Sequence, residues 1–159
     1  MPYPNSEVPI LMLHTMGQEY STPERSWTND VHNEAAFRII SKFIAERLPS
    51  ADITILCYYS AAAKRIAAMG PPSQVYTVNR YQGRECDIAI IVTTRISVKN
   101  VYKNTDFILD PLRATVALSR AKEGIVIIGD QSLLIQSPLW KTYLERYSEC
   151  MATIQQFFK

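Results

Sequence analysis

The sequence predicts an α/β fold in which helices cover both faces of a mostly parallel sheet. Short apolar runs typical of strands alternate along the chain with segments whose apolar residues recur at helical spacing. One run, residues 87–94 (DIAIIVTT), is almost continuously apolar, as in a strand that is buried on both faces. The 159 residues fit one domain with a sizeable core, and we expect residues 1–159 to form a single domain.

The first expected elements are a strand and a long amphipathic helix. Residues 8–14 (VPILMLH) predict the strand, and the polar residues 15–30 that follow are expected to form a loop. Asn29 or Asp30 can cap the helix, which is predicted over residues 32–47. Its apolar residues form a stripe that can face the sheet. The stripe consists of Ala36, Ile39, Ile40, Phe43, Ile44 and Leu48.

The middle of the chain predicts three strands and one short helix. The strands cover residues 52–57 (DITILC), 74–78 and 87–94. The helix covers residues 61–69 (AAAKRIAAM) and is stopped by the Gly-Pro-Pro that follows. Residues 95–109 are polar, and we expect them to form a long loop insertion.

The C-terminal part predicts two helices that flank a strand. Asp110 can serve as an N-cap with Pro111 at the first helical position, and this helix is expected to continue through Ala121. Residues 125–128 (IVII) predict a strand, and residues 138–148 a final helix. The parallel connections in this order are expected to be right-handed.

Composition excludes several classes of protein. The formal net charge of +2 neither demands nor excludes nucleic acid. Cys57, Cys86 and Cys150 stand alone, without a Cys-x-x-Cys pair or a histidine at ligand spacing, so no metal site is expected. Free thiols suit a reducing compartment, and the first residues carry no signal-peptide pattern. No apolar run reaches the length of a membrane span. We therefore expect a cytoplasmic or nuclear protein.

The loop between two of the predicted strands carries a first candidate site, Gln82-Gly83-Arg84-Glu85. A glycine allows the backbone to approach a ligand closely. Arg84 can grip a phosphate or carboxylate in a fork, and Glu85 can accept hydrogen bonds from ribose hydroxyls. The alternative is a loop with a solvated Arg–Glu pair.

Two arginines on one predicted helix form a second candidate. Arg113 and Arg120 are seven residues apart, close to two helical turns, so we expect them on the same side of the helix. One guanidinium can face a nucleotide while the other pairs locally. The alternative is a pair of ordinary surface arginines, although Arg120 is flanked by the small residues Ser119 and Ala121.

Tyr58, Tyr59 and Ser60 follow a predicted strand, where ligands bind in open α/β sheets. A tyrosine can stack on a base, and Ser60 can cap a helix or touch a phosphate. The alternative is one tyrosine in the core and the other exposed. Basic residues near strand ends or in the 95–109 loop can line a track for a phosphate backbone, or belong to a solvated surface. They are Lys64, Arg65, Arg80, Arg95, Lys99 and Lys103.

Two motifs of nucleotide hydrolysis are absent from the sequence. None of the five glycines belongs to a Gly-x-x-x-x-Gly-Lys-Ser/Thr loop, and no acidic strand end for magnesium is evident. A phosphoryl-transfer enzyme needs both. We therefore expect the chain alone to lack ATPase activity.

Together these segments resemble motifs V and VI of superfamily 1 RNA/DNA helicases, and most closely the nonsense-mediated-decay group. Residues 77–88 (TVNRYQGRECDI) are similar to the family's TVDxFQGRE-D-I, and residues 110–121 (DPLRATVALSRA) to DPRRLNVALTRA. Residues 55–62 resemble ITPYxAQ, and residues 138–147 resemble PLWxxLLxxY. The resemblance implies a RecA-like lobe of the P-loop NTPase type that lacks its own Walker A motif. It would be the second lobe of a helicase, within a longer protein.

The resemblance also implies roles for single residues. Arg120 corresponds to the arginine finger on the γ-phosphate, Glu85 to the acid that contacts the nucleotide, and Thr77 to a contact with the nucleic-acid backbone. The nucleotide side is expected to include Gln82, Gly83, Arg84, Glu85 and Arg113. The strand side is expected to include Thr77, Tyr58, Tyr59, Ser60, Asn79 and Arg80. The implied cofactor is ATP with Mg²⁺, bound mainly by the first lobe, and the implied partners are that lobe and single-stranded RNA or DNA.

The sequence departs from the family pattern at several positions. Asn79 replaces an aspartate, Leu112 an arginine and Thr115 an asparagine, while Tyr58 and Ala62 replace a proline and a glutamine. These changes leave a second reading open: a degenerate, non-catalytic lobe that binds RNA or protein in an RNA-silencing or RNA-surveillance complex. A third reading is an unrelated nucleotide-binding regulatory domain.

Overall fold

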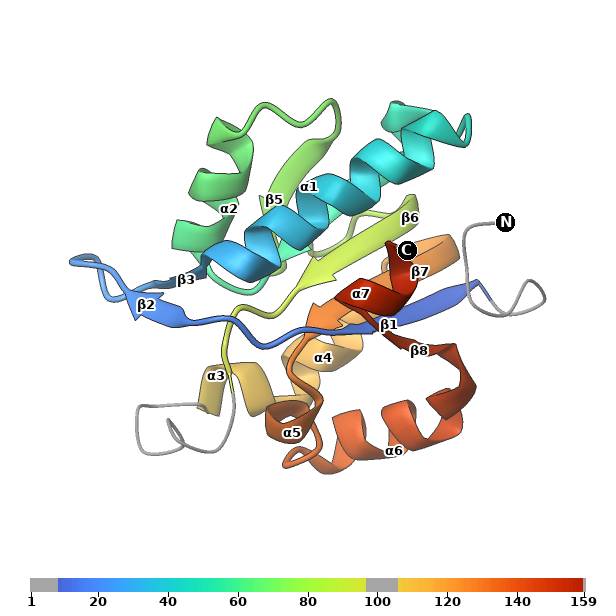
Figure 1. Cartoon of the computed structure of the whole chain (residues 1–159). Coiled ribbons are helices and arrows are strands. Elements are labelled where there is room, and N and C mark those ends of the chain that lie inside the picture. Colours follow the sequence, from blue (N-terminus) through green and yellow to red (C-terminus); the bar gives the residue numbers. More distant parts are fainter. Residues whose placement is uncertain (1–8, 97–105, 159) are drawn as a thin grey trace.

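A six-stranded parallel sheet forms the centre of the molecule (Figure 1). The structure is a computed structural model that describes residues 9–96 and 106–158. The strand order is β5-β4-β6-β7-β1-β8. The strands are β1 (Ile10–His14), β4 (Ile53–Cys57), β5 (Gln74–Thr77), β6 (Cys86–Val92), β7 (Ala121–Gly129) and β8 (Met151–Thr153). A separate antiparallel hairpin pairs β2 (Glu19–Ser21) with β3 (Trp27–Asn29).

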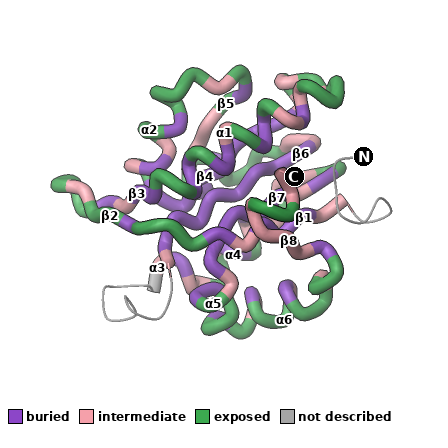
Figure 2. The backbone as a smooth tube through the Cα atoms, viewed as in Figure 1, coloured by how far each residue is buried: buried purple, intermediate pink, exposed green. Residues whose placement is uncertain are grey.

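Helices cover both faces of the sheet (Figure 1). They are α1 (Asp30–Ala45), α2 (Ser60–Ala68), α3 (Asp106–Leu109), α4 (Pro111–Leu118), α5 (Gln131–Leu134), α6 (Pro138–Arg146) and α7 (Ile154–Phe157). The first apolar core lies between the sheet and α1, α2 and α7, and the second between the sheet and α3, α4, α5 and α6. Figure 2 shows the central strands as the most continuously buried part of the chain. The predicted α/β fold with a mostly parallel sheet is confirmed.

The helix α1 illustrates why these residues form these elements. The Asn29 side chain caps it by accepting from the backbone N–H groups of Val31 and His32. Ile39, Ile40 and Phe43 of the predicted stripe are fully buried against the sheet. The predicted cap at Asn29 is confirmed, and so is the stripe as far as the partly buried Ile44, but α1 ends at Ala45, so Leu48 packs against the same core from beyond the helix.

Two segments differ from the expectation in ways that matter for the site. The expected loop over residues 15–30 contains the β2–β3 hairpin, which the Glu19–Arg95 ion pair and hydrogen bonds from Asn29 tie to the rest of the molecule. The helix α4 ends at Leu118 rather than at Ala121. From Ala121 the chain instead pairs with β6 as strand β7, four residues before the strand expected from the apolar run.

Further elements escaped the sequence pattern because they are short. α5, β8 and α7 have three or four residues each, too few for a periodicity to register. α3 lies within the expected 95–109 loop. Residues 97–105 of that loop, including Lys99 and Lys103, lie outside the described residues.

Candidate functional site

The two motifs that the sequence singled out meet at the edge where the strands begin. The loop 82–85 directly precedes β6, and Arg120 directly precedes β7. These strands are neighbours, with Cys86 in register with Ala121. Gly83 takes a φ of 77°, a left-handed conformation that glycine adopts without strain. The loop therefore turns at Gly83 and enters the sheet beside Arg120.

The Arg120 side chain is bonded to this loop. Its Nη1 donates to the carbonyl oxygen of Arg84 over 3.2 Å, and its Nη2 donates to Ser119 Oγ over 2.9 Å. The backbone N–H of Cys86 donates to the Arg120 carbonyl over 3.0 Å. The Arg120 Nε is buried and has no hydrogen-bond partner among the described residues. The guanidinium is thus held in place by Arg84 and Ser119, while its buried Nε stays unpaired.

Arg84 and Glu85 carry opposite charges outward from the same loop. The Arg84 guanidinium lies 4.7 Å from the ring centre of Tyr76 and 5.3 Å from that of Tyr81. Glu85 pairs with Lys122 at 3.6 Å, and both side chains are more than half exposed. An exposed pair of this kind contributes little to stability, so Glu85 can exchange Lys122 for another partner at small cost.

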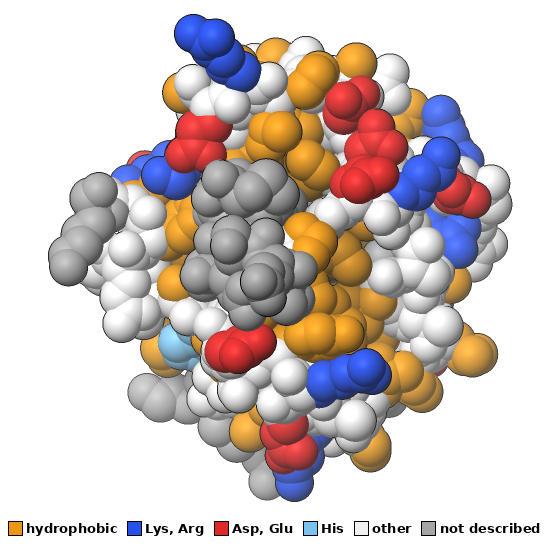
Figure 3. Space-filling model, turned by 90° about the vertical axis from the view of Figure 1, so that its right-hand side faces the viewer, with side chains coloured by type: hydrophobic (Ala, Val, Ile, Leu, Met, Phe, Trp, Pro, Cys, Tyr) orange, Lys and Arg blue, Asp and Glu red, His pale blue; other side chains and the backbone are white. Residues whose placement is uncertain are grey.

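Charges of both signs are interspersed on this side of the molecule. Figure 3 looks at the side from which the strands begin, and acidic and basic side chains lie next to each other around an area of hydrophobic side chains. The described residues in this view form no continuous basic surface of the kind that a phosphate backbone requires.

Arg113 does not share a helix face with Arg120, and that expectation is wrong. Since α4 ends at Leu118, Arg120 lies in the turn beyond it. Arg113 instead pairs with Asp110, the N-cap of its own helix, at 2.6 Å, and its guanidinium lies 3.9 Å from the ring centre of Phe107. It is the arginine that pairs locally.

A second group of predicted residues meets at the opposite edge, where β4 and β5 end. They line a pocket of about 370 Å³ together with the hairpin and α3. The lining residues are Glu24, Arg25, Ser26, Trp27, Tyr58, Tyr59, Ser60, Thr77, Asn79 and Phe107. The structure therefore separates the candidate residues into two sites, at opposite edges of one sheet.

Tyr58 and Tyr59 are both largely buried in the wall of this pocket. Their exposed fractions are 2% and 9%, and the rings lie 6.1 and 5.1 Å from the ring centre of Phe107. Burial raises the pKa of the Tyr59 hydroxyl to about 12. The expected alternative of one buried and one exposed ring does not hold, and little of either ring is available to a base.

Ser60 and Thr77 make local hydrogen bonds at the pocket. Ser60 Oγ donates to Ser26 Oγ over 3.3 Å, and Ser26 Oγ also accepts from the first free N–H of α2, that of Ala61, over 3.0 Å. The cap of α2 thus comes from the hairpin, not from Ser60. Thr77 Oγ1 accepts from the Arg80 N–H over 3.4 Å, and the side chain of Arg80 is exposed beside the pocket residue Asn79.

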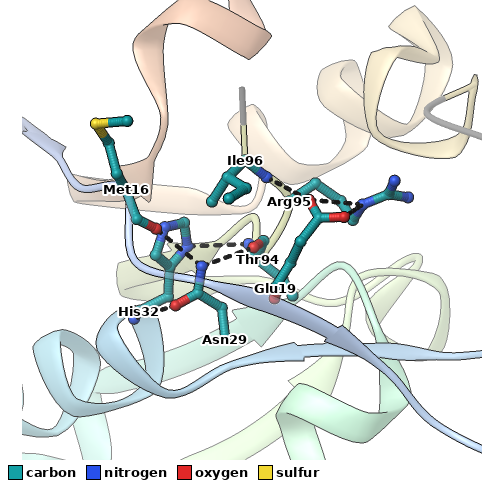
Figure 4. Close-up of polar contacts among 7 residues, drawn as sticks. All are labelled: Met16, Glu19, Asn29, His32, Thr94, Arg95 and Ile96. Atoms are coloured by element: carbon teal, nitrogen blue, oxygen red, sulfur yellow. Dashed lines mark hydrogen bonds and ion pairs between the residues drawn. The ribbon is translucent and has the colours of Figure 1, made fainter. Parts of the chain in front are cut away.

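A buried polar network behind the pocket was not foreseen from the sequence (Figure 4). Asn29 Nδ2 donates to the carbonyls of Met16 and Thr94, and the Thr94 N–H donates to Nδ1 of His32 over 3.1 Å. Nε2 of His32 therefore carries the proton and donates to the Thr15 carbonyl over 2.8 Å. Burial lowers the pKa of His32 to about 4. Thr94 has a φ of 71°, an unfavourable conformation for a β-branched residue that these bonds hold in place.

An ion pair lies beside this network. Arg95, which was expected in a basic track, is buried, and its Nε donates to both carboxylate oxygens of Glu19 at 3.2 Å (Figure 4). Glu19 also accepts from the Ile96 N–H over 2.7 Å. The Arg95 guanidinium lies 3.9 Å from the ring centre of Trp27. Arg95 therefore serves the hairpin and is not a contact for phosphate.

No sequence pattern indicated the roles of Glu19, Trp27 and Arg95. Glu19 and Trp27 lie in a polar stretch without periodicity, and Arg95 follows the end of an apolar strand as an exposed arginine would. Trp27 and Thr28, an aromatic and a β-branched residue, favour a strand before Asn29. Three residues are too few for the alternation of a strand to be recognised.

The part of the chain that the structure describes contains neither a metal-binding cluster nor a membrane-spanning helix. Residues 9–96 and 106–158 contain no group of three histidine, cysteine, aspartate or glutamate side chains that could hold a metal ion. The same residues include no helix long and apolar enough to cross a membrane.

Comparison with known proteins places the chain among helicase sequences. Residues 1–132 match the family described as AAA domain. Regulator of nonsense transcripts 1 from Dictyostelium discoideum is 27% identical over 92% of this chain. Its homolog from Arabidopsis thaliana is 29% identical over 93% of the chain, and the ATP-dependent helicase upf1 from Schizosaccharomyces pombe 26% identical over 87%. The predicted resemblance to helicases of the nonsense-mediated-decay group is confirmed by these relatives.

The chain spans only a small part of these proteins, 12% of the Dictyostelium and Arabidopsis relatives and 16% of the Schizosaccharomyces one. A solved structure, the C-terminal domain of a possible DNA helicase from Lactobacillus plantarum, superposes with a TM-score of 0.53 at 14% identity. The match covers 92% of this chain and 84% of that domain. The likeness shows a shared RecA-like fold, as the sequence predicted.

Proposed function

Because the chain belongs to the AAA domain family, we propose that it forms the C-terminal motor lobe of an ATP-dependent superfamily 1 helicase. One observation carries the proposal: Arg120 and the loop 82–85, which lie far apart in the sequence, are hydrogen-bonded at one edge of the sheet. In this reading residues 1–159 are one lobe of a longer protein, and ATP binds in a cleft between this edge and the first lobe.

Arg120 would supply the arginine finger of that cleft. Its guanidinium is anchored by Arg84 and Ser119, so its position is fixed before a nucleotide arrives. A preorganised positive charge stabilises the charge that develops on a transferring phosphoryl group. Glu85, whose side chain forms an exposed ion pair with Lys122, would turn to the ribose hydroxyls.

The remaining parts of a nucleotide site fit this lobe poorly. The chain has no phosphate-cradling loop, and its described residues hold no metal-binding cluster. We therefore assign the binding of Mg²⁺ and of the phosphate chain to the first lobe. ATP bound in the cleft would supply the free energy that opens and closes the two lobes.

The pocket at the opposite edge would hold part of the single strand. Thr77, Asn79 and Ser60 present polar groups there, and Arg80, Lys64 and Arg65 are exposed near it. Phosphate contacts of this kind bind without reading sequence. Three relatives carry names that refer to nonsense transcripts or to a helicase, which supports RNA as the strand in a surveillance role.

A non-catalytic lobe that binds RNA or protein is the second candidate, and Leu112 favours it. This residue stands where the resemblance places an arginine, and it is 76% exposed in a shallow pocket with Gln82 and Arg113. An exposed leucine in place of an arginine suits a protein contact better than a phosphate contact.

The test is ATP turnover by the longer protein that contains this lobe, measured with saturating single-stranded RNA. We expect Arg120→Ala to lower kcat by about 10³-fold or more, with a smaller effect on ATP binding. Arg120→Lys should fail as well, because a point charge cannot reproduce the planar fork. Lys141→Ala, an exposed charge on α6, is the matched control. Unchanged turnover in Arg120→Ala would remove the finger from the proposal, and absent turnover in the unaltered protein would favour the second candidate.

A further inference from the structure

We infer that Trp27 is the platform on which one base of the bound strand stacks. The inference rests on the proposed function, since it assigns a role within the pocket at the ends of β4 and β5. It also replaces the tyrosines that the sequence suggested for this role.

Trp27 is the aromatic residue of the hairpin that lines the pocket. It is partly exposed, and it lines the pocket together with Ser26 and with residues at the ends of β4 and β5. Tyr58 and Tyr59 lie deeper and are covered by Phe107. An incoming base therefore meets the indole of Trp27 with less rearrangement than either tyrosine would require.

The indole is held from behind by the Arg95 guanidinium, 3.9 Å from its ring centre. Arg95 is itself fixed by the buried carboxylate of Glu19. A buried ion pair is costly to desolvate and is often no more stable than apolar residues of the same size. Its use here is positional, because it holds one face of the indole and leaves the exposed part of the ring to the pocket.

Two further contacts fix the hairpin on either side of Trp27. On one side, Ser26 Oγ accepts from the backbone of α2 at Ala61. On the other, Asn29 Nδ2 donates to the carbonyls of Met16 and Thr94. The platform is thus rigid before the strand binds, and a preorganised ring loses less entropy on binding.

The adjoining pocket suits the phosphates next to such a base. It shares Glu24, Ser26 and Ser60 with the first pocket, and Lys64 and Arg65 lie in its wall. The first pocket is also lined by Arg25 and Glu24. Hydrogen bonds lower the pKa of the Glu24 carboxyl, which keeps it charged. Glu24 lines both pockets, whereas Lys64 and Arg65 lie in the second alone, so the backbone phosphates belong beside these two basic residues and the base in the aromatic pocket.

The intrinsic fluorescence of the chain provides a direct readout. The chain has two tryptophans, and the other one, Trp140, is fully buried in the second core. Binding of a uniform single strand should quench the emission of the unaltered chain. The same strand should cause no quenching in Trp27→Phe, which keeps a stacking ring but loses the signal. A strand of equal length without bases should bind without quenching.

Affinity measured by anisotropy of a labelled strand gives the second readout. Trp27→Ala should weaken binding by about 5- to 150-fold, the range measured for a base stacked on an aromatic ring. The dependence of affinity on salt should stay unchanged, since stacking releases no counterions. Trp27→Phe should retain most of the affinity. Lys64→Ala, as the contrasting variant, should weaken strands with and without bases alike and reduce the salt dependence.

The outcomes separate this inference from the function on which it rests. Binding without quenching, together with unchanged affinity in Trp27→Ala, would overturn the platform and leave the strand site intact. Absence of binding even at low salt would overturn the strand site itself and the platform with it. If Trp27→Ala does not fold, the unaltered chain still tests the platform, because strands with bases should quench its fluorescence and strands without bases should not.

Discussion

The Arg120 guanidinium donates to the main-chain carbonyl of Arg84 over 3.2 Å, which joins two motifs 36 residues apart in the sequence. The contact depends on the end of α4 at Leu118, because only then does Arg120 enter the turn before β7. Neighbouring parallel strands begin at the same edge, so the loop before β6 and the turn before β7 necessarily lie side by side. The topology thus brings together, without any periodic signal in the sequence, the residues that we propose as one half of a nucleotide cleft.

The isolated chain of 159 residues should not hydrolyse ATP. It has no phosphate-cradling loop and its described residues hold no metal-binding cluster, both of which phosphoryl transfer requires. Phosphate release should equal the buffer background with and without RNA. Turnover that persists through repeated purification and disappears in Arg120→Ala would contradict this expectation.

Single-strand binding by the isolated chain should be weak and should fall as salt rises. Lys64, Arg65 and Arg80 are exposed at the edge where β4 and β5 end, and one lobe can neutralise only a few phosphates. Removing one side chain that binds a phosphate should lower the slope of log affinity against log salt by about 0.7. Alanine at each of these positions can be compared with Lys141→Ala on α6. Equal slopes in all four variants would place the track elsewhere.

Much of the fold could be predicted because its strands and long helices carry strong periodic signals. The cap at Asn29 and the buried stripe of α1 follow directly from residue type and spacing. The end of α4 could not be predicted in the same way. Residues 119–122 suit a helix locally, but pairing of β7 with β6 satisfies their backbone groups and prevails.

The sequence indicated which residues belong to the candidate site better than it indicated how they are arranged. The loop 82–85 and Arg120 were identified from sequence, and the structure brings them together, but it sends Arg113 to Asp110 instead. The hairpin was missed because its stability comes from distant partners. Glu19 meets Arg95 across 76 positions of sequence, and no local pattern reports such a pair.

Removing one partner of the Glu19–Arg95 pair should destabilise the chain strongly, whereas replacing both partners with apolar residues should destabilise it much less. Glu19→Ala leaves a buried guanidinium without its carboxylate, and we expect a loss of about 3–5 kcal/mol in the free energy of unfolding. Replacing both residues, as in Glu19→Leu with Arg95→Met, should recover most of that loss. Urea denaturation of Glu19→Leu, Arg95→Met and the double variant, compared with the unaltered chain, gives the coupling energy. A loss below about 1 kcal/mol in both single variants would show that water reaches the pair and screens it.

His32 should make stability depend on pH in the mildly acidic range. Its pKa of about 4 in the folded chain lies below the value of about 6.5 in an unfolded chain. Between these values the unfolded chain binds the proton more readily, so the free energy of unfolding falls as pH falls. Protonation of Nδ1 would also remove the acceptor of the Thr94 N–H and release a strained turn.

The measurement compares urea denaturation of the unaltered chain with His32→Gln at several pH values. From pH 7 to pH 5 the unaltered chain should lose about 2 kcal/mol more than the variant, whose glutamine does not titrate. His14 is present in both proteins, so its contribution cancels in the difference. Parallel curves over this range would mean that His32 titrates alike in the folded and unfolded chains, and that its hydrogen bonds to Thr15 and Thr94 do not hold the neutral ring.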